Sequence, residues 1–382
     1  MKKLAIIGSS EFQLPLIKAA KEQGIETHVF SWGGNEDIPD FFYQISIVEK
    51  DDILQKCKDI GIDGICSIGS DLANITVNYI ALAMGLVSNS EQCTDYTTNK
   101  HLMRNVLKEN NIPIPEFVYI NESIIFEPVY FPIIVKPIDR SGSRGITLVE
   151  DNAGIKSAIE FAYAESFSKE ILIEQFITGR EFSVESISFK GKHEILQITE
   201  KFTTGSPDFI EKGHICPARV TEAEKASIFD VVYKLLDAVC LSNGASHTEL
   251  KINENGDVYI IEIGSRMGGD YIGSDLVLNS TGFDFTKAVL AIALGEDFCK
   301  GKYISNHLIP RVTIVKFIFN EQDLNMSEKI IGMEDVSVIH SDLNKELFVN
   351  CKLIKSSSDR QGHILLSVCK KSQNETLKNL GL

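Results

Sequence analysis

Two glutamates that face each other across a predicted β-hairpin could together hold a metal ion. The hairpin lies within residues 244–269 and turns at Asn255-Gly256, a dipeptide that favours tight turns. With a loop from Glu254 to Asp257, Glu249 lies opposite Glu262. Directly opposed carboxylates repel each other, and a cation between them relieves that repulsion. Such oxygen ligands suit Mg²⁺, which usually binds one or two carboxylates together with phosphate oxygens.

The alternation of side chains along the two strands separates apolar from polar residues. The expected apolar face carries Leu250, Ile252, Tyr259, Ile261 and Ile263, and the polar face carries His247, Glu249, Lys251 and Glu262. A slip of one residue would mix the two sets, so the pattern favours this register. The alternative interpretation is a surface hairpin whose two glutamates are solvated.

Cationic and glycine residues flank this hairpin. Arg266 and the pair Gly268-Gly269 follow the second strand, where a guanidinium and bare backbone N–H groups could hold an anion. Lys100 lies in the first turn of a predicted helix, a position where the helix dipole disfavours a cation. A nearby anion would explain this lysine, and a solvated side chain is the alternative.

A further candidate anion site lies between predicted strands at 131–136 and 146–149. It follows Lys136, has a Gly/Ser tip that includes Ser143, and ends at Arg144. Glycine backbone, hydroxyl groups and flanking cations are suited to cradle phosphate groups. The segment lacks the GxxxxGK[ST] pattern of a Walker loop, and solvated hairpins can have a similar composition.

The composition limits the class of partner. The chain has 382 residues and a formal net charge of −15, which disfavours the phosphate backbone of nucleic acid as a partner. No apolar stretch approaches the length of a membrane span, and the N-terminus lacks a signal sequence. The eight cysteines form no CxxC pair, which is typical of reduced thiols. We therefore expect a cytoplasmic protein without nucleic-acid or membrane partners.

The elements that must position these residues begin with a βαβ unit. Strands at 4–7 and 27–30 enclose a helix at about 11–23, which predicts a parallel sheet. The turn lacks GxGxxG, so a dinucleotide site is not favoured. Asp71 follows another strand, at 64–68, and could contact substrate, although capping of the next helix is the preferred interpretation.

Two later segments are candidates for function. Residues 175–180 look like a hinge between two lobes. Residues 200–217 are expected to form a long loop that contains Glu211 and His214, and such loops are usually functional or disordered. Further on, a small antiparallel C-terminal domain is expected from short strands at 311–319, 336–340, 353–355 and 362–369.

Together these motifs resemble the ATP-grasp superfamily, and within it the carboxylate–amine (L-amino-acid) ligases. The matching segments are TTNKHLMR, FPIIVKP, SGSRGI, LIEQFITGREFSVE, HTEL and IIEIGSRMGG. The layout is also similar to that of biotin carboxylase and the purine-biosynthesis carboxylases. The resemblance covers essentially the whole chain, and its motifs are specific in combination.

The resemblance implies an α/β fold, with α+β grasp lobes. A Rossmann-like pre-ATP-grasp domain is expected at residues 1–95 and a two-lobed ATP-grasp domain at 96–305, with its lid lobe at about 113–172. A small β-rich C-terminal domain is expected at 306–382.

The resemblance also implies roles for individual residues around ATP and Mg²⁺, with Mn²⁺ as an alternative metal. The implied phosphate contacts are Lys100, Lys136, Ser143, Arg144 and Gly145. The implied adenine contacts are Glu174, Gln175, Phe176 and Ile177, the ribose contact is Glu181, and the metal ligands are Glu249 and Glu262. Arg266 falls where the family places an arginine on the transferred phosphate. One position departs from the family: its usual EINPR is here Glu262-Ile263-Gly264-Ser265-Arg266, so Gly264 replaces an asparagine that often completes a metal site.

The chemistry that fits is formation of an acyl phosphate from a substrate carboxylate and ATP, followed by attack of an amine, expected to be that of an amino acid. Lys136 and Arg266 would meet charge on the transferring group, and Gly268 and Gly269 would hold the oxyanion. The candidate substrate contacts are Glu211, His214, Arg266 and Asp270. We expect small-molecule carboxylate and amine substrates, and a homodimer is left open. The alternatives are a carboxylase or formate ligase of the same fold, or a nucleotide-binding regulatory protein without catalysis.

Overall fold

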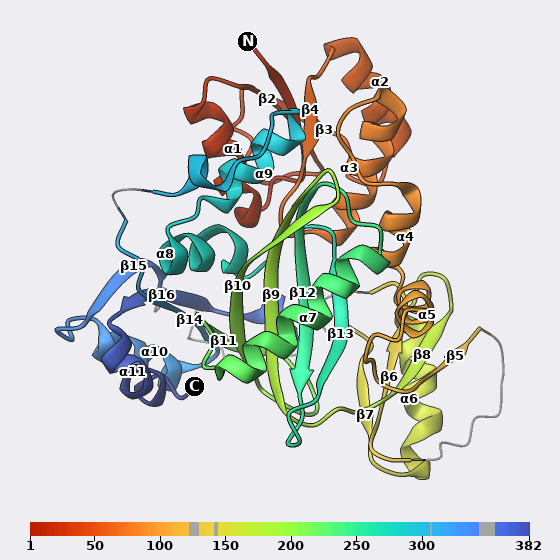
Figure 1. The fold of residues 1–382 in the computed structure, drawn as a ribbon, viewed down its shortest axis with the longest axis vertical. Helices are drawn as coiled ribbons and strands as arrows, with labels where there is room; N and C mark the ends of the chain where they lie inside the picture. Colours follow the sequence, from red (N-terminus) through yellow and green to blue (C-terminus); the bar gives the residue numbers. More distant parts are fainter. Residues whose placement is uncertain (122–129, 141–143, 306–307, 344–355) are drawn as a thin grey trace.

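The computed structural model describes residues 1–121, 130–140, 144–305, 308–343 and 356–382. Figure 1 shows an α/β unit at the N-terminal end, a long antiparallel sheet in the middle and a smaller lobe beside the lower end of that sheet. In these residues the strands form three sheets, two of four strands and one of eight. No helix within the same residues is both long and apolar enough to cross a lipid bilayer.

A parallel sheet of order β3-β2-β1-β4 opens the chain, and it confirms the expected βαβ start. Its strands are β1 (Lys3–Ile7), β2 (Glu26–Ser31), β3 (Phe41–Gln44) and β4 (Gly64–Cys66). The helices that follow these strands are α1 (Leu14–Glu22), α2 (Lys50–Ile60), α3 (Asp71–Met84), α4 (Glu91–Thr98) and α5 (Lys100–Glu109). Ser70 caps α3 through the Ala73 N–H, and Asn99 caps α5, so short polar side chains fix where both helices begin.

The smaller lobe has a four-stranded antiparallel sheet of order β5-β8-β6-β7. Its elements are β5 (Phe117–Ile120), β6 (Ile133–Pro137), β7 (Thr147–Val149), α6 (Asn152–Glu165) and β8 (Ile171–Gln175). Ile155 and Ala162 of α6 pack on Ile133, Val135 and Ile173 of the sheet. The lobe therefore has a core of its own.

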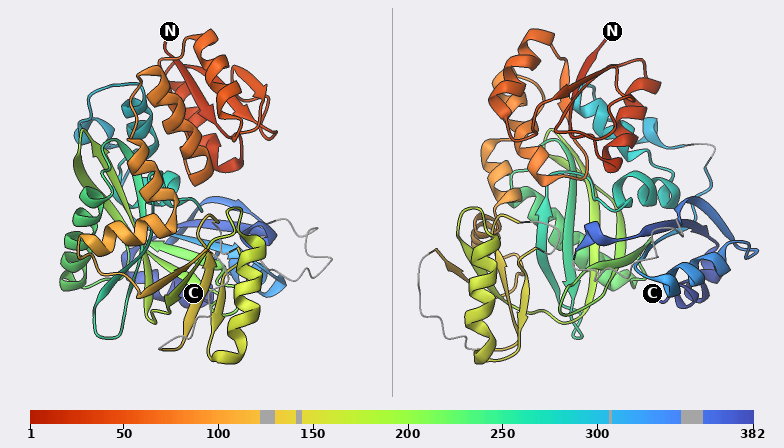
Figure 2. Two further views of the ribbon diagram at one scale, coloured as in Figure 1. Left: turned by 90° about the vertical axis from the view of Figure 1, so that its right-hand side faces the viewer. Right: turned by 180° about the vertical axis from the view of Figure 1, so that it is seen from behind.

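The body of the molecule is the eight-stranded sheet of order β13-β12-β9-β10-β11-β14-β16-β15. Its strands are β9 (Arg180–Phe189), β10 (Lys192–Thr203), β11 (Glu211–Cys216), β12 (Gly244–Ile252), β13 (Val258–Gly264), β14 (Val312–Ile318), β15 (Val336–Asp342) and β16 (Gly362–Val368). Helix α7 (Glu222–Ala238) lies along one face, as Figures 1 and 2 show, and begins with the capping box of Thr221 and Glu224. Ile228 and Leu235 of this helix pack against Leu250 and other strand residues.

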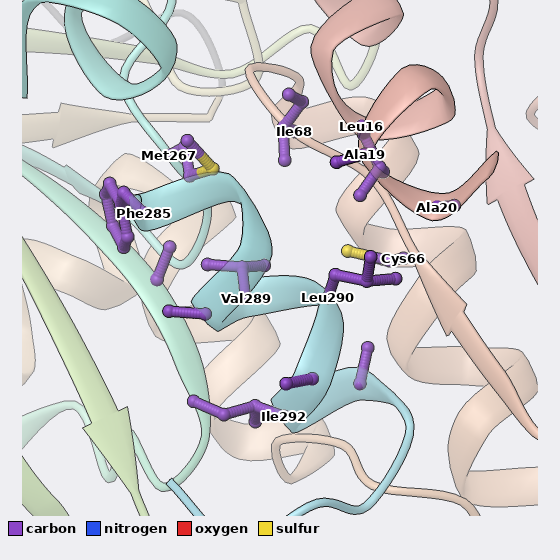
Figure 3. Packing of buried hydrophobic residues seen from close by; sticks show 14 of the residues in the cluster. Leu16, Ala19, Ala20, Cys66, Ile68, Met267, Phe285, Val289, Leu290 and Ile292 are labelled. Carbon is purple, nitrogen blue, oxygen red and sulfur yellow. The ribbon is translucent and has the colours of Figure 1, made fainter. Parts of the chain in front are cut away.

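Helix α9 (Phe285–Ala293) joins the N-terminal unit to the central sheet. Figure 3 shows its Leu290 beside Leu16 and Cys66 of the N-terminal unit. Ile187 of β9 and Ala245 of β12 belong to the same buried cluster. This shared core holds the two units together, so that residues from both can line one site.

The C-terminal strands continue the central sheet, because β14 pairs with β11 and then with β16. Two helices that the sequence did not lead us to expect, α10 (Glu321–Ile330) and α11 (Gln373–Asn379), pack on this end through Ile330 and Leu377. A further short helix, α8 (Val277–Thr281), precedes α9. The strand expected at 353–355 lies outside the described residues.

The hairpin of β12 and β13 turns at Asn255-Gly256, and Glu249 lies opposite Glu262 as expected. The register near the turn differs from the expected one, because a β-bulge follows Glu249 and leaves Ile261 without a paired residue. Val258 and Ile260 are therefore in the core, and the prediction that Tyr259 and Ile261 are core residues was wrong.

Residues 200–217 are not a long loop, so this prediction was also wrong. Strand β10 extends to Thr203, and β11 returns antiparallel to it. The strands were hard to recognise because several of their inward side chains, such as Lys201 and Glu211, are charged. These residues face an ionic site rather than an apolar core, so the usual alternation of hydrophobicity is missing.

The core that α9 builds gives a test of this assembly. Replacing Leu290, which is 0% exposed, by alanine should lower the free energy of unfolding by about 2–5 kcal/mol, because it removes apolar contacts and leaves a cavity. The matched control is Leu82→Ala on α3, where the side chain is 47% exposed. We expect that change to stay within about 0.5 kcal/mol. Urea unfolding followed by circular dichroism measures both, and equal costs would contradict the packing described.

Candidate active site

A deep cleft lies between the smaller lobe and the central sheet. It encloses about 1080 Å³, its open mouth included. The walls come from the N-terminal unit, both sheets and the segment that joins them. The expected site residues that line it are Lys100, Lys136, Glu174, Gln175, Phe176, Ile177, Glu181, Glu211, Glu249, Glu262 and Arg266. Charged residues that are far apart in the sequence therefore line one cavity.

One part of the cleft is apolar. Ile134 and Ile146 come from the lobe, Phe176 and Phe209 from the connecting segments, and Ile261 from the bulge in β13. The rings of Phe176 and Phe209 are 6.0 Å apart between centroids. Apolar walls of this kind suit a flat aromatic group, while the ionic remainder of the cleft suits a charged one.

The two carboxylates of the hairpin are held by cations from other elements. Glu249 lies 2.6 Å from Lys201 Nζ of β10, and Glu262 lies 2.9 Å from Lys100 Nζ of α5. Burial alone would raise the pKa of Glu249, but attraction to Lys201 and the bond from His247 hold it well below its usual value. Burial would likewise lower the pKa of Lys100, and Glu262 outweighs that effect and raises it. Glu249 is therefore ionised.

This donor set fits a hard divalent cation bound together with an anionic ligand. Within the described residues no group of three or more His, Cys, Asp and Glu side chains could hold a metal by itself. Glu249 and Glu262 supply two opposed carboxylates, and Mg²⁺ commonly takes its other ligands from phosphate oxygens and water. The residues present therefore fit Mg²⁺ only when a phosphate ligand accompanies it.

Glu174 has a different position from the one the resemblance implied. Both oxygens of its carboxylate are already paired with cations. Oε1 lies 2.6 Å from Arg104 Nε, and Oε2 lies 2.6 Å from Lys136 Nζ. Burial alone would raise the pKa of Glu174, but the two cations outweigh burial and lower it to about 2. Arg104 was missed by the sequence analysis, although it stands four residues after Lys100 in the same quoted motif.

Arg266 is clamped from the N-terminal unit. Its Nε and Nη2 donate to the two carboxylate oxygens of Asp71 at 2.8 and 2.9 Å. The preferred interpretation of Asp71 as a helix cap was wrong, because Ser70 is the cap and Asp71 lines the cleft. The pair also explains Gly264. A Cβ there would lie 2.5 Å from Asp71 Oδ1, so the position has no room for a side chain.

Gly268 is not available to hold an oxyanion, which corrects that expectation. Its backbone N–H donates to Glu185 Oε2 at 2.8 Å. The other oxygen of the fully buried Glu185 bonds to His247 Nδ1, and His247 Nε2 lies 3.2 Å from Glu249 Oε1. Burial lowers the pKa of His247, and Glu185 outweighs that effect and raises it. His247 therefore links Glu185 to Glu249 and helps to fix the carboxylate of Glu249, a candidate metal ligand. Gly269 is the other glycine that was expected to hold the oxyanion. A Cβ added to it would have no neighbouring atom within 4 Å.

The expected substrate residues are only partly together. Glu211 lines the cleft, but His214 is 0% exposed and packs edge-on against Phe317, away from it. Asp270 bonds to Arg360 at 2.8 and 2.9 Å, and Arg360 also reaches Glu211 at 3.0 Å. Direct substrate contact by His214 is therefore contradicted by its burial. Arg360, in the C-terminal segment, carried no motif that would have identified it.

The residues of the expected phosphate loop are divided. Ser143 lies outside the described residues. Arg144 lines a neighbouring cavity with Arg140, next to Lys100 and Glu262. At Gly145 the backbone has φ +74°, and a Cβ would meet Pro137 at 2.7 Å, so this position requires glycine for backbone reasons.

Comparison with known proteins finds relatives of part of the chain. A family model described as an ATP-grasp domain matches residues 129–275. A D-alanine–D-alanine ligase of Flavobacterium psychrophilum is 30% identical over 184 residues, which cover 45% of this chain and 55% of that protein. A second one, from Thermosipho africanus, is 27% identical over 212 residues, with 51% and 56% covered. The chain thus spans about half the length of these curated relatives.

The similarity in fold to solved structures covers the whole chain. An L-amino acid ligase from Bacillus licheniformis superposes with a TM-score of 0.81 and 22% identity, over 100% of this chain and 97% of that one. At this identity the likeness shows the fold. Residues 129–275 are therefore an ATP-grasp domain, and the resemblance and the α/β fold class inferred from the sequence are confirmed.

The close fit between Gly264 and the Asp71–Arg266 pair can be tested without knowing the reaction. Gly264→Ala should lower the free energy of unfolding by about 1–3 kcal/mol, because the methyl group collides with the half-buried Asp71–Arg266 ion pair. Gly301→Ala, where a Cβ meets nothing within 4 Å, is the control and should cost little. In an Asp71→Ala background the cost of Gly264→Ala should shrink, as a double-mutant cycle by urea unfolding would measure. Strict additivity of the two changes would speak against the collision.

Proposed function

We propose that this protein is an ATP-dependent ligase that activates a substrate carboxylate as an acyl phosphate and couples it to an amine, with an amino acid as the source of the amine. One observation carries the proposal. Two opposed carboxylates, Glu249 and Glu262, share a cleft with Lys100, Lys136 and Arg266, next to an apolar region. An aromatic base attached to a polyphosphate with its metal has the same division into apolar and charged parts.

The assignment of ATP within the cleft follows from that division. Phe176, Ile177 and Ile261 would enclose the adenine, and Glu181 would reach the ribose hydroxyls. Lys100 and Lys136 would contact phosphate oxygens, since both line the cleft and their Nζ atoms lie beside Glu262 and Glu174. Glu249 and Glu262 would hold Mg²⁺, which when bound offsets the negative charge of the phosphates.

The reaction itself needs position and charge more than a protein nucleophile. An oxygen of the substrate carboxylate would attack the γ-phosphorus of ATP, and the bond to the β-phosphate oxygen would break to release ADP. The amine would then attack the acyl carbon, and phosphate would leave as the amide forms. Arg266, held by Asp71, would stabilise the negative charge of the transferred group.

The names of similar proteins support an amide product. A D-alanine–D-alanine ligase and an L-amino acid ligase both join amino acids according to their names, and the second shares the fold over the full chain. Glu211 lines the cleft and is joined through Arg360 to Asp270, and this charged cluster could bind a second substrate. We accordingly place the substrates between the central sheet and the N-terminal unit.

The metal assignment predicts that Glu262→Gln is nearly inactive although folded. Losing one of two metal-holding carboxylates should lower turnover by about a hundredfold or more, because several kcal/mol of charge stabilisation are lost. The assay is coupled ADP release with saturating Mg²⁺, after a screen of amino-acid pairs, bicarbonate and formate has found the substrates. Glu254→Gln, at the exposed turn of the same hairpin, is the control. Near-normal turnover of Glu262→Gln would remove this residue from the site.

The acyl phosphate predicts where a labelled oxygen goes. With ¹⁸O in the substrate carboxylate, one labelled oxygen should appear in inorganic phosphate, because that oxygen forms the bond to phosphorus. Mass spectrometry of the released phosphate measures it. Activation by adenylation would place the label in AMP and release pyrophosphate, and these products would refute the proposed chemistry. ADP release that depends on bicarbonate or formate, and not on an amino acid, would instead favour a carboxylase or a formate ligase.

A further inference from the structure

Arg104 is the largest side chain of the molecule that is fully buried among the described residues, and it lies behind the cleft wall. It follows Lys100 by one helical turn on α5, so both cations leave the helix on the same side. Arg104 Nε donates to Glu174 Oε1 at 2.6 Å and Nη2 donates to the Ile261 carbonyl at 2.8 Å. Lys136 and Glu174 line the cleft, whereas Arg104 does not.

The charges of this cluster do not cancel. Arg104 and Lys136 carry two positive charges, and Glu174 carries one negative charge that both cations share. In the part of the chain that the structure describes, Glu174 is the carboxylate that pairs with either of them. The three side chains are 0%, 5% and 3% exposed, so water screens the excess charge poorly. A buried net charge of this kind is costly until a counter-ion arrives.

We propose that Arg104 is a positioning residue that keeps the charge of Lys136 available for the phosphates of a nucleotide. Without Arg104, the whole charge of Glu174 would be directed at Lys136, and the pair would be neutral towards a ligand. With Arg104, the cluster presents one net positive charge to the cleft through Lys136. This inference rests on the proposed nucleotide site, and it assigns a role to a residue that never touches the nucleotide.

The geometry makes Arg104 suited to this task. A guanidinium can bond to a carboxylate and a carbonyl at once with a fixed fork of N–H groups, and it remains charged when buried. The bond to the Ile261 carbonyl holds the fork beside the bulge in β13, while Glu174 sits on β8 of the smaller lobe. Arg104 thus fixes the Glu174 carboxylate from the side opposite Lys136.

The experiment measures nucleotide affinity, so it does not require the substrates. Titration calorimetry of the full chain with the Mg²⁺ complex of a non-hydrolysable ATP analogue, and separately with adenosine, compares four variants. Arg104→Gln should weaken binding of the analogue by about tenfold or more, since one charge next to the phosphates is lost. It should leave adenosine binding unchanged. Arg104→Lys should retain most of the affinity for the analogue. Lys108→Gln, an exposed position on the same helix, is the control for loss of one positive charge.

The decisive variant is the double change Arg104→Gln with Glu174→Gln. It restores a net charge of one at Lys136, so affinity for the analogue should recover towards that of the natural protein. If the double variant binds no better than Arg104→Gln, or if adenosine binding falls as much as that of the analogue, Arg104 has a structural role only and the proposal is wrong. If the unaltered protein binds neither ligand, the nucleotide site itself is refuted, and the two failures are thus distinguishable.

Discussion

The site depends on one physical constraint: the partly buried carboxylates of the cleft are matched by cations from other elements. Glu249 of β12 meets Lys201 of β10, Glu262 of β13 meets Lys100 of α5, and Asp71 of α3 meets Arg266. Because these carboxylates are shielded from most of the solvent, an unpaired charge among them costs more than the loss of an ion pair on the open surface. The pairs therefore act as distance constraints between elements that are remote in the chain. Attraction to these cations outweighs burial and lowers the pKa values of Glu249 and Asp71, so these two carboxylates are ionised.

The same constraint explains the departures of the fold from simple patterns. A regular β13 would place residues alternately in the core and in the cleft, but the bulge after Glu249 allows Ile261 and Glu262 to line the cleft in succession. Strand β10 accepts Lys201 at a position facing inward because three glutamates surround it. Gly264 is small because the carboxylate of Asp71 occupies the neighbouring space. In each case local regularity is replaced by a requirement of the charged cleft.

Sequence patterns were sufficient where one signal decides the structure. The Asn255-Gly256 turn and the opposition of Glu249 to Glu262 each depend on residues of one hairpin and were found. Contacts between distant segments were not accessible in this way. Nothing local to Asp71 indicates that its partner is Arg266, and nothing local to Arg360 indicates Asp270. The burial of His214 was missed for the same reason, since a polar residue beside Glu211 in a presumed loop gives no sign that β14 covers it.

Residues that line the cleft, and residues that pair with its lining, lie on both sides of the segment that matches the family model. Residues 129–275 contain Lys136, Glu249, Glu262 and Arg266, but Asp71 and the two cations of α5 precede that segment, and Arg360 follows it. If this segment were taken alone, Glu262 would lose Lys100 and Arg266 would lose Asp71. The remaining charges would then have to be solvated or protonated, and the cleft would change its electrostatic character. The shared core around α9 and the continuous sheet through β14 are thus needed for the site. They hold the N-terminal unit and the C-terminal strands, which supply these charged partners, against the central strands.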